Sequence, residues 1–100
     1  MQFICHLKLR SESADRQVLT ADLVQAEIQR IHQLLGSGTI RDAWKKADAV
    51  AIALLLDVAD EAECRAVIGS LPFSIAGVLE VELVSQVEPY VDVFPERGAH

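Results

Sequence analysis

The feature that most constrains this chain is an almost wholly apolar segment, Ala49–Val58. Its continuous apolar run ends at Leu56 and is far too short to span a bilayer, but it suits a strand. Side chains alternate between the two faces of a strand. Here both faces are apolar, one with Val50, Ile52, Leu54 and Leu56, the other with Ala51, Ala53 and Leu55. Such a strand needs apolar cover on both faces.

Hydrophobic periodicity predicts the remaining elements. Alternation predicts strands at 2–10, 39–46 and about 78–86, and helical spacing predicts helices at about 20–35 and 60–69. Thr20 or Asp22 can cap the first helix, and a glycine of Gly36-Ser37-Gly38 suits the left-handed residue that ends it. Asp60 and Glu63 suit the start of the second helix. Leu71-Pro72-Phe73 is expected to lead into the last strand.

The order strand-helix-strand-strand-helix-strand is typical of a ferredoxin-like α+β domain, with both helices on one face of a four-stranded antiparallel sheet. The chain of 100 residues is expected to form one domain over 1–95 and a disordered tail over 96–100. The helices leave the second apolar face of 49–58 uncovered. A second subunit packed sheet against sheet would cover it, so we expect at least a homodimer.

Composition excludes several classes of function. The net charge is −6 and the nine basic residues are scattered, which argues against a nucleic-acid partner. The N-terminal segment lacks the features of a signal peptide, so we expect a cytoplasmic protein without a membrane partner. The three histidines lack metal-ligand spacing and glycines are too sparse for a dinucleotide loop, so no metal or other cofactor is predicted. Cys5 and Cys64 are expected as buried free thiols, with a disulfide or a catalytic thiol as the alternatives.

Glu27 is the residue that fits its surroundings least. Helical spacing places it between Leu34 and Ile31, inside the apolar stripe of the first helix. Two interpretations stay open. It is either an edge residue that bends to water or pairs with a basic side chain, or a partly desolvated carboxylate whose raised pKa suits a general base.

His6 and Lys8 share the polar face of the first strand. His6 is either an interface histidine or a second acid–base group. Glu80 and Glu82 on the last strand are expected to face the same way and to pair with Lys8, Arg10 or a partner subunit.

Several short motifs together resemble the muconolactone Δ-isomerase family. They are Glu27, the run Gly38-Thr39-Ile40-Arg41-Asp42-Ala43-Trp44, then Asp57-Val58 and Leu71-Pro72-Phe73. The family has a Glu in the first helix, a Gly-Thr-Trp-Arg-x-x-Trp strand and a Leu-Pro-Leu turn before the last strand. The spacing matches without gaps from Glu27 through Phe73.

The resemblance implies a ferredoxin-like subunit in an oligomeric α+β barrel, as close dimers and often as larger rings. It also implies cofactor-free proton transfer on a small lactone carboxylate. Glu27 falls on the family's helix Glu, Arg41 on its strand Arg and Trp44 on its second Trp. The resemblance therefore favours Glu27 as the catalytic base.

Two departures from the family pattern bear on the substrate. Ile40 stands where the family has its first strand Trp, and Gln86-Val87-Glu88-Pro89 replaces an Arg-His-Pro after the last strand. The loss of Arg and His and the gain of Glu88 predict that muconolactone is a poor substrate. A larger or less charged ligand is expected, in a mostly apolar pocket with Trp44 near its wall.

Three functions follow as hypotheses. The first is a cofactor-independent isomerase that moves a proton on an unsaturated lactone or a related enolisable small molecule. Glu27 would act as the base with His6 assisting, and Arg41 or Lys8 would hold an oxyanion or carboxylate. The second is a cyclase or cofactor-independent oxygenase that tailors a polyketide-like natural product. The third is a ligand-binding or structural oligomer without catalysis. The pathway is open between aromatic catabolism and natural-product biosynthesis.

Overall fold

The computed structural model describes residues 1–10, 19–47 and 51–90. Its elements in order are β1 (Gln2–Leu9), α1 (Ala21–Gly36), β2 (Ile40–Lys45), β3 (Ala51–Asp57), α2 (Glu61–Gly69), α3 (Pro72–Ile75) and β4 (Leu79–Val87). This order confirms the predicted alternation of strands and helices and adds the short α3. Val50 and the tail predicted at 96–100 lie outside the described residues.

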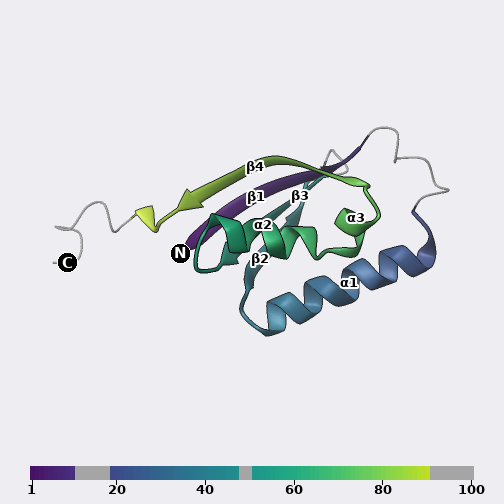
Figure 1. Cartoon of the computed structure of the whole chain (residues 1–100), viewed down its shortest axis with the longest axis horizontal. Coiled ribbons are helices and arrows are strands. Elements are labelled where there is room, and N and C mark those ends of the chain that lie inside the picture. Colours follow the sequence, from purple (N-terminus) through teal and green to yellow (C-terminus); the bar gives the residue numbers. More distant parts are fainter. Residues whose placement is uncertain (11–18, 48–50, 91–100) are drawn as a thin grey trace, which may run out of the picture.

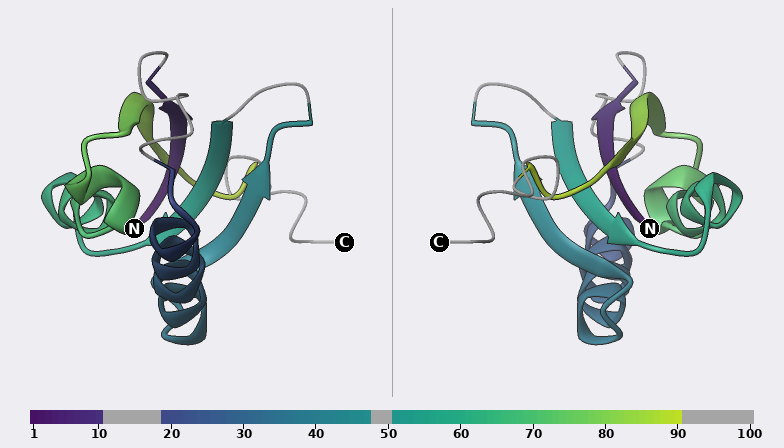
Figure 2. Two further views of the ribbon diagram at one scale, coloured as in Figure 1. Left: turned by 90° about the vertical axis from the view of Figure 1, so that its right-hand side faces the viewer. Right: turned by 90° about the vertical axis from the view of Figure 1, so that its left-hand side faces the viewer.

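The four strands form one antiparallel sheet in the order β2-β3-β1-β4. β1 therefore lies inside the sheet, between β3 and β4, as the ferredoxin-like topology requires. α1 and α2 lie on the same side of the sheet (Figures 1 and 2). The predicted α+β fold is confirmed.

The core lies between the sheet and these helices. On β1 the alternation is as expected, because Phe3, Cys5 and Leu7 are buried while their neighbours are partly exposed. The sheet and the helices both contribute buried residues to this core: Phe3, Cys5, Leu7, Leu34, Ile40, Leu54, Leu56, Val58, Cys64, Ile68 and Leu71. In α1 the most deeply buried residues are Glu27 and Leu34, whereas Ile28 and Leu35 are 42% and 38% exposed. The apolar stripe of α1 is therefore only partly packed on the sheet.

No helix of the described residues covers the opposite side of the sheet, called here the outer sheet face. His6 pairs with both Ala53 and Leu83, and Trp44 pairs with Ala53. Residues paired across antiparallel strands share a face, so these four side chains form a row across the outer sheet face. Trp44 is 51% and Leu83 41% exposed. The sheet thus presents apolar side chains on both faces, as the segment 49–58 predicts.

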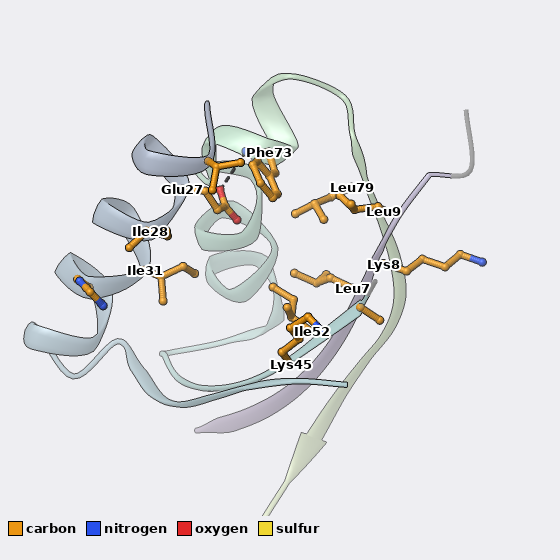
Figure 3. A pocket seen from close by; sticks show the side chains of 13 residues that line it. Leu7, Lys8, Leu9, Glu27, Ile28, Ile31, Lys45, Ile52, Phe73 and Leu79 are labelled. Atoms are coloured by element: carbon orange, nitrogen blue, oxygen red, sulfur yellow. Dashed lines mark hydrogen bonds between the residues drawn. The ribbon is translucent and has the colours of Figure 1, made fainter. Parts of the chain in front are cut away.

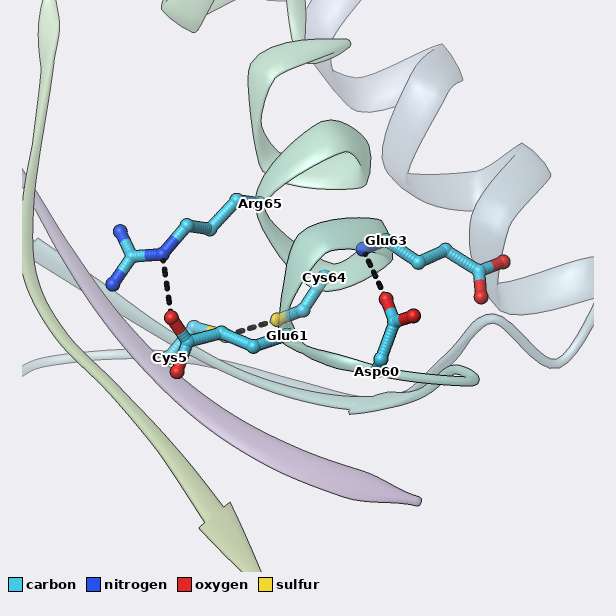
Figure 4. A network of polar contacts seen from close by, with 6 residues as sticks. All are labelled: Cys5, Asp60, Glu61, Glu63, Cys64 and Arg65. Atoms are coloured by element: carbon cyan, nitrogen blue, oxygen red, sulfur yellow. Dashed lines mark hydrogen bonds and ion pairs between the residues drawn. The ribbon is translucent and has the colours of Figure 1, made fainter.

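The helix ends follow the sequence signals. Thr20 Oγ1 accepts a hydrogen bond from the Leu23 amide at 3.1 Å, which makes Thr20 the cap of α1. Gly38, with φ +79°, supplies the left-handed residue after that helix. At α2 the Asp60 Oδ1 accepts from the Glu63 amide at 2.8 Å, and Glu63 Oε2 accepts from the Ala59 amide at 2.8 Å. Figure 4 shows the Asp60 cap.

Leu71-Pro72-Phe73 leads into the last strand as expected, but through a short helix that the sequence pattern did not predict, because Pro72 begins α3. The fixed φ of proline suits the first position of a helix, where its missing amide hydrogen is not needed. Gly77, with φ +75°, follows α3 before the chain enters β4. This extra turn places the Phe73 amide beside α1, where the candidate site lies.

Cys5 and Cys64 are free and fully buried, as expected, and their Sγ atoms lie 3.4 Å apart between β1 and α2 (Figure 4). Burial raises the pKa of the Cys5 thiol to about 12 and also raises that of Cys64. A raised pKa disfavours the thiolate, so this pair is a poor candidate for a nucleophile.

Candidate active site

A cavity of about 450 Å³ opens between α1, α3 and the sheet (Figure 3). It is called here the Glu27 cavity. Its walls are mainly aliphatic and aromatic, and its apolar lining residues are Leu7, Leu9, Val24, Ile28, Ile31, Ala51, Ile52, Phe73 and Leu79. Its size falls within the range of about 300–1,000 Å³ common for small-molecule sites.

Glu27 projects into this cavity from α1 (Figure 3) and is only 7% exposed. Its Oε1 accepts a hydrogen bond from the backbone amide of Phe73 at 3.0 Å. Its Oε2 is buried, and no group among the described residues donates to it. One oxygen is therefore anchored, while the other has no hydrogen-bond partner in the described part of the chain.

Burial raises the pKa of Glu27, and the hydrogen bond from Phe73 opposes this only in part. Desolvation favours the neutral form of a carboxyl group, whereas a donor to the charged form disfavours it. A carboxylate with a raised pKa is a stronger base than one in water. Glu27 is therefore a desolvated carboxyl rather than an edge residue in water, while its role as a base stays a prediction.

The position of Glu27 is set by α1 and by contacts at its far side. Val24 and Ile31 share its side of the helix, because residues three and four apart are neighbours there, and the adjacent Ile28 borders the same cavity. Arg30 holds α1 in place, since its Nε and Nη2 donate to Ser70 Oγ at 3.3 and 3.0 Å. Glu27 thus sits on a helix that is hydrogen-bonded to the end of α2, which limits its movement.

Two polar lining residues, His32 and Lys45, play no part in the sequence-based prediction of the site. His32 lies four residues after Ile28 and so continues the cavity side of α1. Lys45 pairs with Ile52 and so lies on the helix side of the sheet. The helical period of α1 could have predicted that His32 lies on the same side of the helix as Ile28. The face of the sheet on which Lys45 lies depends on the register shift between Ile40 and Asp42, and the sequence does not reveal that shift.

His6 and Lys8 lie apart from Glu27. Lys8 contributes to the cavity wall, but its side chain extends away from the cavity (Figure 3). Its Nζ lies 3.6 Å from Glu80 and 3.5 Å from Glu82, which confirms the expected pairing with the last strand. His6 belongs to the outer sheet face, so the sheet separates it from Glu27.

Arg41 and Trp44 are also outside the Glu27 cavity. Arg41 is exposed on β2, at the register shift. Trp44 belongs to the outer sheet face and borders a second hollow of about 210 Å³, which shares Ile31, Lys45 and Ile52 with the Glu27 cavity. Of the five predicted site residues, a single subunit therefore brings only the Glu27 side chain into the cavity.

This arrangement suits proton transfer. An apolar chamber holds one carboxyl group with a free oxygen, so a ligand C–H or O–H brought to Oε2 meets a base shielded from water. Within residues 1–10, 19–47 and 51–90, no three His, Cys, Asp or Glu side chains are grouped as a metal site. No helix in that part of the chain is long and apolar enough to cross a membrane.

Comparisons with known proteins agree with this geometry. A model of a family described as Muconolactone delta-isomerase matches residues 1–87. The fold is similar to that of a 5-chloro-2-hydroxyhydroquinone dehydrochlorinase (TftG) from Burkholderia phenoliruptrix AC1100, solved in complex with 2,5-dihydroxybenzoquinone. The TM-score is 0.72 at 17% identity, over 92% of this chain and 98% of the other. A search of curated protein sequences found no match. The chain therefore belongs to the muconolactone delta-isomerase family, and this membership supports an enzyme that converts a small molecule.

Proposed function

We propose that this chain is a cofactor-independent isomerase that moves a proton on an unsaturated lactone or a related enolisable small molecule. The observation that carries the proposal is the state of Glu27. One of its carboxyl oxygens is held by the Phe73 amide at 3.0 Å, and the other is buried in an apolar cavity where no described residue donates a hydrogen bond to it. The family, whose name describes an isomerase of a lactone, supports the same reaction class.

The chemistry needs one base and a place for negative charge. The ionised Glu27 takes the proton from the carbon next to the lactone carbonyl, and the electron pair of that C–H bond passes into an enolate. The same carboxyl then returns the proton to the far end of the conjugated system, so no oxidant or reductant is consumed. Proton transfer by a positioned side chain contributes typically about 10²–10⁴-fold to a rate.

The proposal is tested with Glu27→Gln, which keeps the shape of the side chain and removes the proton acceptor. We expect turnover to fall by about 10²–10⁴-fold, with folding and assembly unchanged. The assay follows isomerisation and deuterium uptake by NMR, with α-angelica lactone, muconolactone and aryl-substituted butenolides as probes. The departures from the family pattern predict that muconolactone is turned over less efficiently than the larger lactones.

Glu61→Gln is the matched control, because Glu61 is an exposed residue of α2 that pairs with Arg65 at 3.1 Å. Near-normal turnover by Glu27→Gln would demote Glu27 and leave His6 as the next candidate. A variant that fails to assemble would place Glu27 in a structural role. A wild-type protein that exchanges no C–H proton in any probe would favour the ligand-binding oligomer.

A second candidate reaction begins with the same step. The structurally similar protein is named a dehydrochlorinase. Loss of hydrogen chloride also starts when a base removes a proton, but chloride then leaves with the electron pair. The lactone probes separate the two reactions because they carry no chlorine. Their turnover would therefore show isomerisation, which conserves every atom of the substrate, and could not arise from loss of hydrogen chloride.

We further propose that the protein acts as a homo-oligomer, at least a dimer, through the outer sheet face. The support is the apolar row of Trp44, Ala53 and Leu83 that no helix of the described residues covers. The roles predicted for His6, Lys8, Arg41 and Trp44 stay predictions. They would require a second copy to bring such residues to the Glu27 cavity. A cytoplasmic location also stays a prediction.

A further inference from the structure

The charges that line the Glu27 cavity differ in sign from those of the whole molecule. The chain carries a net charge of −6. Among the described residues that line the cavity, however, three are basic, Lys8, His32 and Lys45, and the one carboxyl is that of Glu27. The Lys8 ammonium pairs with Glu80 and Glu82 away from the cavity, which leaves His32 and Lys45 as its basic groups. His32 and Lys45 are exposed, whereas Glu27 is buried. The cavity thus has a buried end with a carboxyl and an open end with basic groups.

The two basic residues come from different walls. His32 belongs to α1 and lies five residues after Glu27, which is about 7.5 Å along the helix axis. Lys45 belongs to β2 and lies at the end of the cavity away from Glu27 and Phe73 (Figure 3). Its Nζ donates to the Lys46 carbonyl at 3.2 Å, and an ammonium group has three donors, so two remain for a ligand.

We propose that Lys45 and His32 form an anion-binding rim, and that the ligand of this cavity is an amphiphilic anion. Its carboxylate, phenolate or sulfonate group lies at the rim, and its apolar body points toward Glu27. The inference rests on the proposed function in taking this cavity as the ligand site. It refines the expectation of a larger or less charged ligand to a larger ligand that keeps one negative charge.

The size of the cavity supports a body larger than a single five-membered ring. The Glu27 cavity holds about 450 Å³, and it adjoins the second hollow of about 210 Å³. Ile31, Lys45 and Ile52 line both spaces, so Lys45 lies where the two meet. An elongated ligand could therefore pass its apolar body along Lys45 while the ammonium binds its charge.

The test uses two fluorescent probes with the same ring system. One is 8-anilinonaphthalene-1-sulfonate, an anion, and the other is N-phenyl-1-naphthylamine, which lacks the sulfonate. We expect Lys45→Met and His32→Gln each to weaken binding of the anion roughly two- to five-fold, because exposed charge pairs contribute modestly. Binding of the neutral probe should stay within about two-fold of the wild-type value, since both variants keep the apolar walls.

Lys46→Met is the matched control, because it removes the same charge from the neighbouring residue, which does not line the cavity. NMR signals of the Ile28, Ile31 and Ile52 methyl groups locate the probes, and all three should shift when the anion binds. The proposed rim would be wrong if Lys45→Met and His32→Gln changed binding of both probes equally, or changed binding of neither. It would also be wrong if Lys46→Met weakened binding of the anion as much as they do. Methyl signals that stay in place would overturn it as well.

These outcomes are independent of turnover. If Glu27→Gln retains turnover while Lys45→Met weakens binding of the anionic probe but not of the neutral one, the proposed base is wrong and the anion-binding rim is supported. If Glu27→Gln abolishes turnover while both probes bind the rim variants normally, the base stands and the rim is wrong.

Discussion

Glu27 combines two properties that rarely occur together in a stable core. It is buried, and one of its oxygens has no donor among the described residues. A buried polar atom without a partner normally destabilises the folded state, by about 1–3 kcal/mol or more for a charged group. Function is the usual reason for a protein to keep such an atom, which is why Glu27 carries the proposal.

Its titration gives a prediction for stability. The folded pKa of Glu27 lies above its ordinary value of 4.5, so between pH 4.5 and the folded pKa the folded state holds a proton that the unfolded state has released. The stability contributed by this proton is full below pH 4.5 and is lost as pH rises through the folded pKa. We expect Glu27→Gln to gain stability relative to wild type over that rise, measured by urea unfolding from pH 4 to 8. Parallel pH profiles would contradict this, and Glu61→Gln controls for the added glutamine.

How far the sequence predicts the site can be judged from this residue. Helical spacing placed Glu27 among apolar residues, and the family motif singled out the same position. Neither could supply its partner, because Phe73 is distant in the sequence and its amide is positioned by α3, which was not expected. His6, Lys8 and Trp44 were correctly placed on strands, but the face each presents relative to Glu27 depends on how the sheet meets α1.

At the scale of elements, local signals were the most reliable guide. The alternation of β1, the Thr20 cap and the glycine after α1 act over a few residues, and the structure confirms each of them. The register shifts in β1–β4 and β2–β3 pairing are different, because they depend on contacts between distant strands. Like the register shifts, α3 could not be predicted from local signals, since Pro72 is equally compatible with a turn and with the first position of a helix.

The cap of α2 provides a prediction at this scale. Asp60 accepts from the Glu63 amide at 2.8 Å, and loss of such a cap costs about 1 kcal/mol of folding free energy. We expect Asp60→Ala to lower the free energy of unfolding by about this amount in urea titrations. Asp60→Asn should lose much less, because asparagine caps equally well. Equal losses in the two variants would show that the carboxylate charge, rather than the hydrogen bond, stabilises α2.

At the scale of the whole molecule, the outer sheet face is the basis for the proposed homo-oligomer. Ala53 and Leu55 on β3 are only partly buried within one subunit, and Trp44 and Leu83 on either side are more exposed. Exposed apolar surfaces that extend over several neighbouring side chains commonly mark interaction sites. A second copy supplies a matching surface by symmetry.

The corresponding prediction concerns oligomeric state. Light scattering at micromolar concentration should give at least a dimer, and Ala53→Glu should yield a folded monomer, because it places a charge at the centre of the proposed interface. Ala62→Glu on the exposed side of α2 is the control and should leave the assembly intact. A wild-type protein that stays monomeric would contradict the proposal, as would an Ala53→Glu variant that still assembles.

The strand order also determines when the sheet can be completed during synthesis. Ile4 on β1 pairs with Leu55 on β3 and with Ser85 on β4, about fifty and eighty residues later in the chain. Pairings between such distant segments form slowly. While the ribosome makes the chain, β2 and β3 can form a hairpin at once, but β1 keeps one open edge until β4 has emerged. The strand made first is therefore the last to gain both of its neighbours, and during that interval its open edge is the part of the nascent chain most exposed to aggregation.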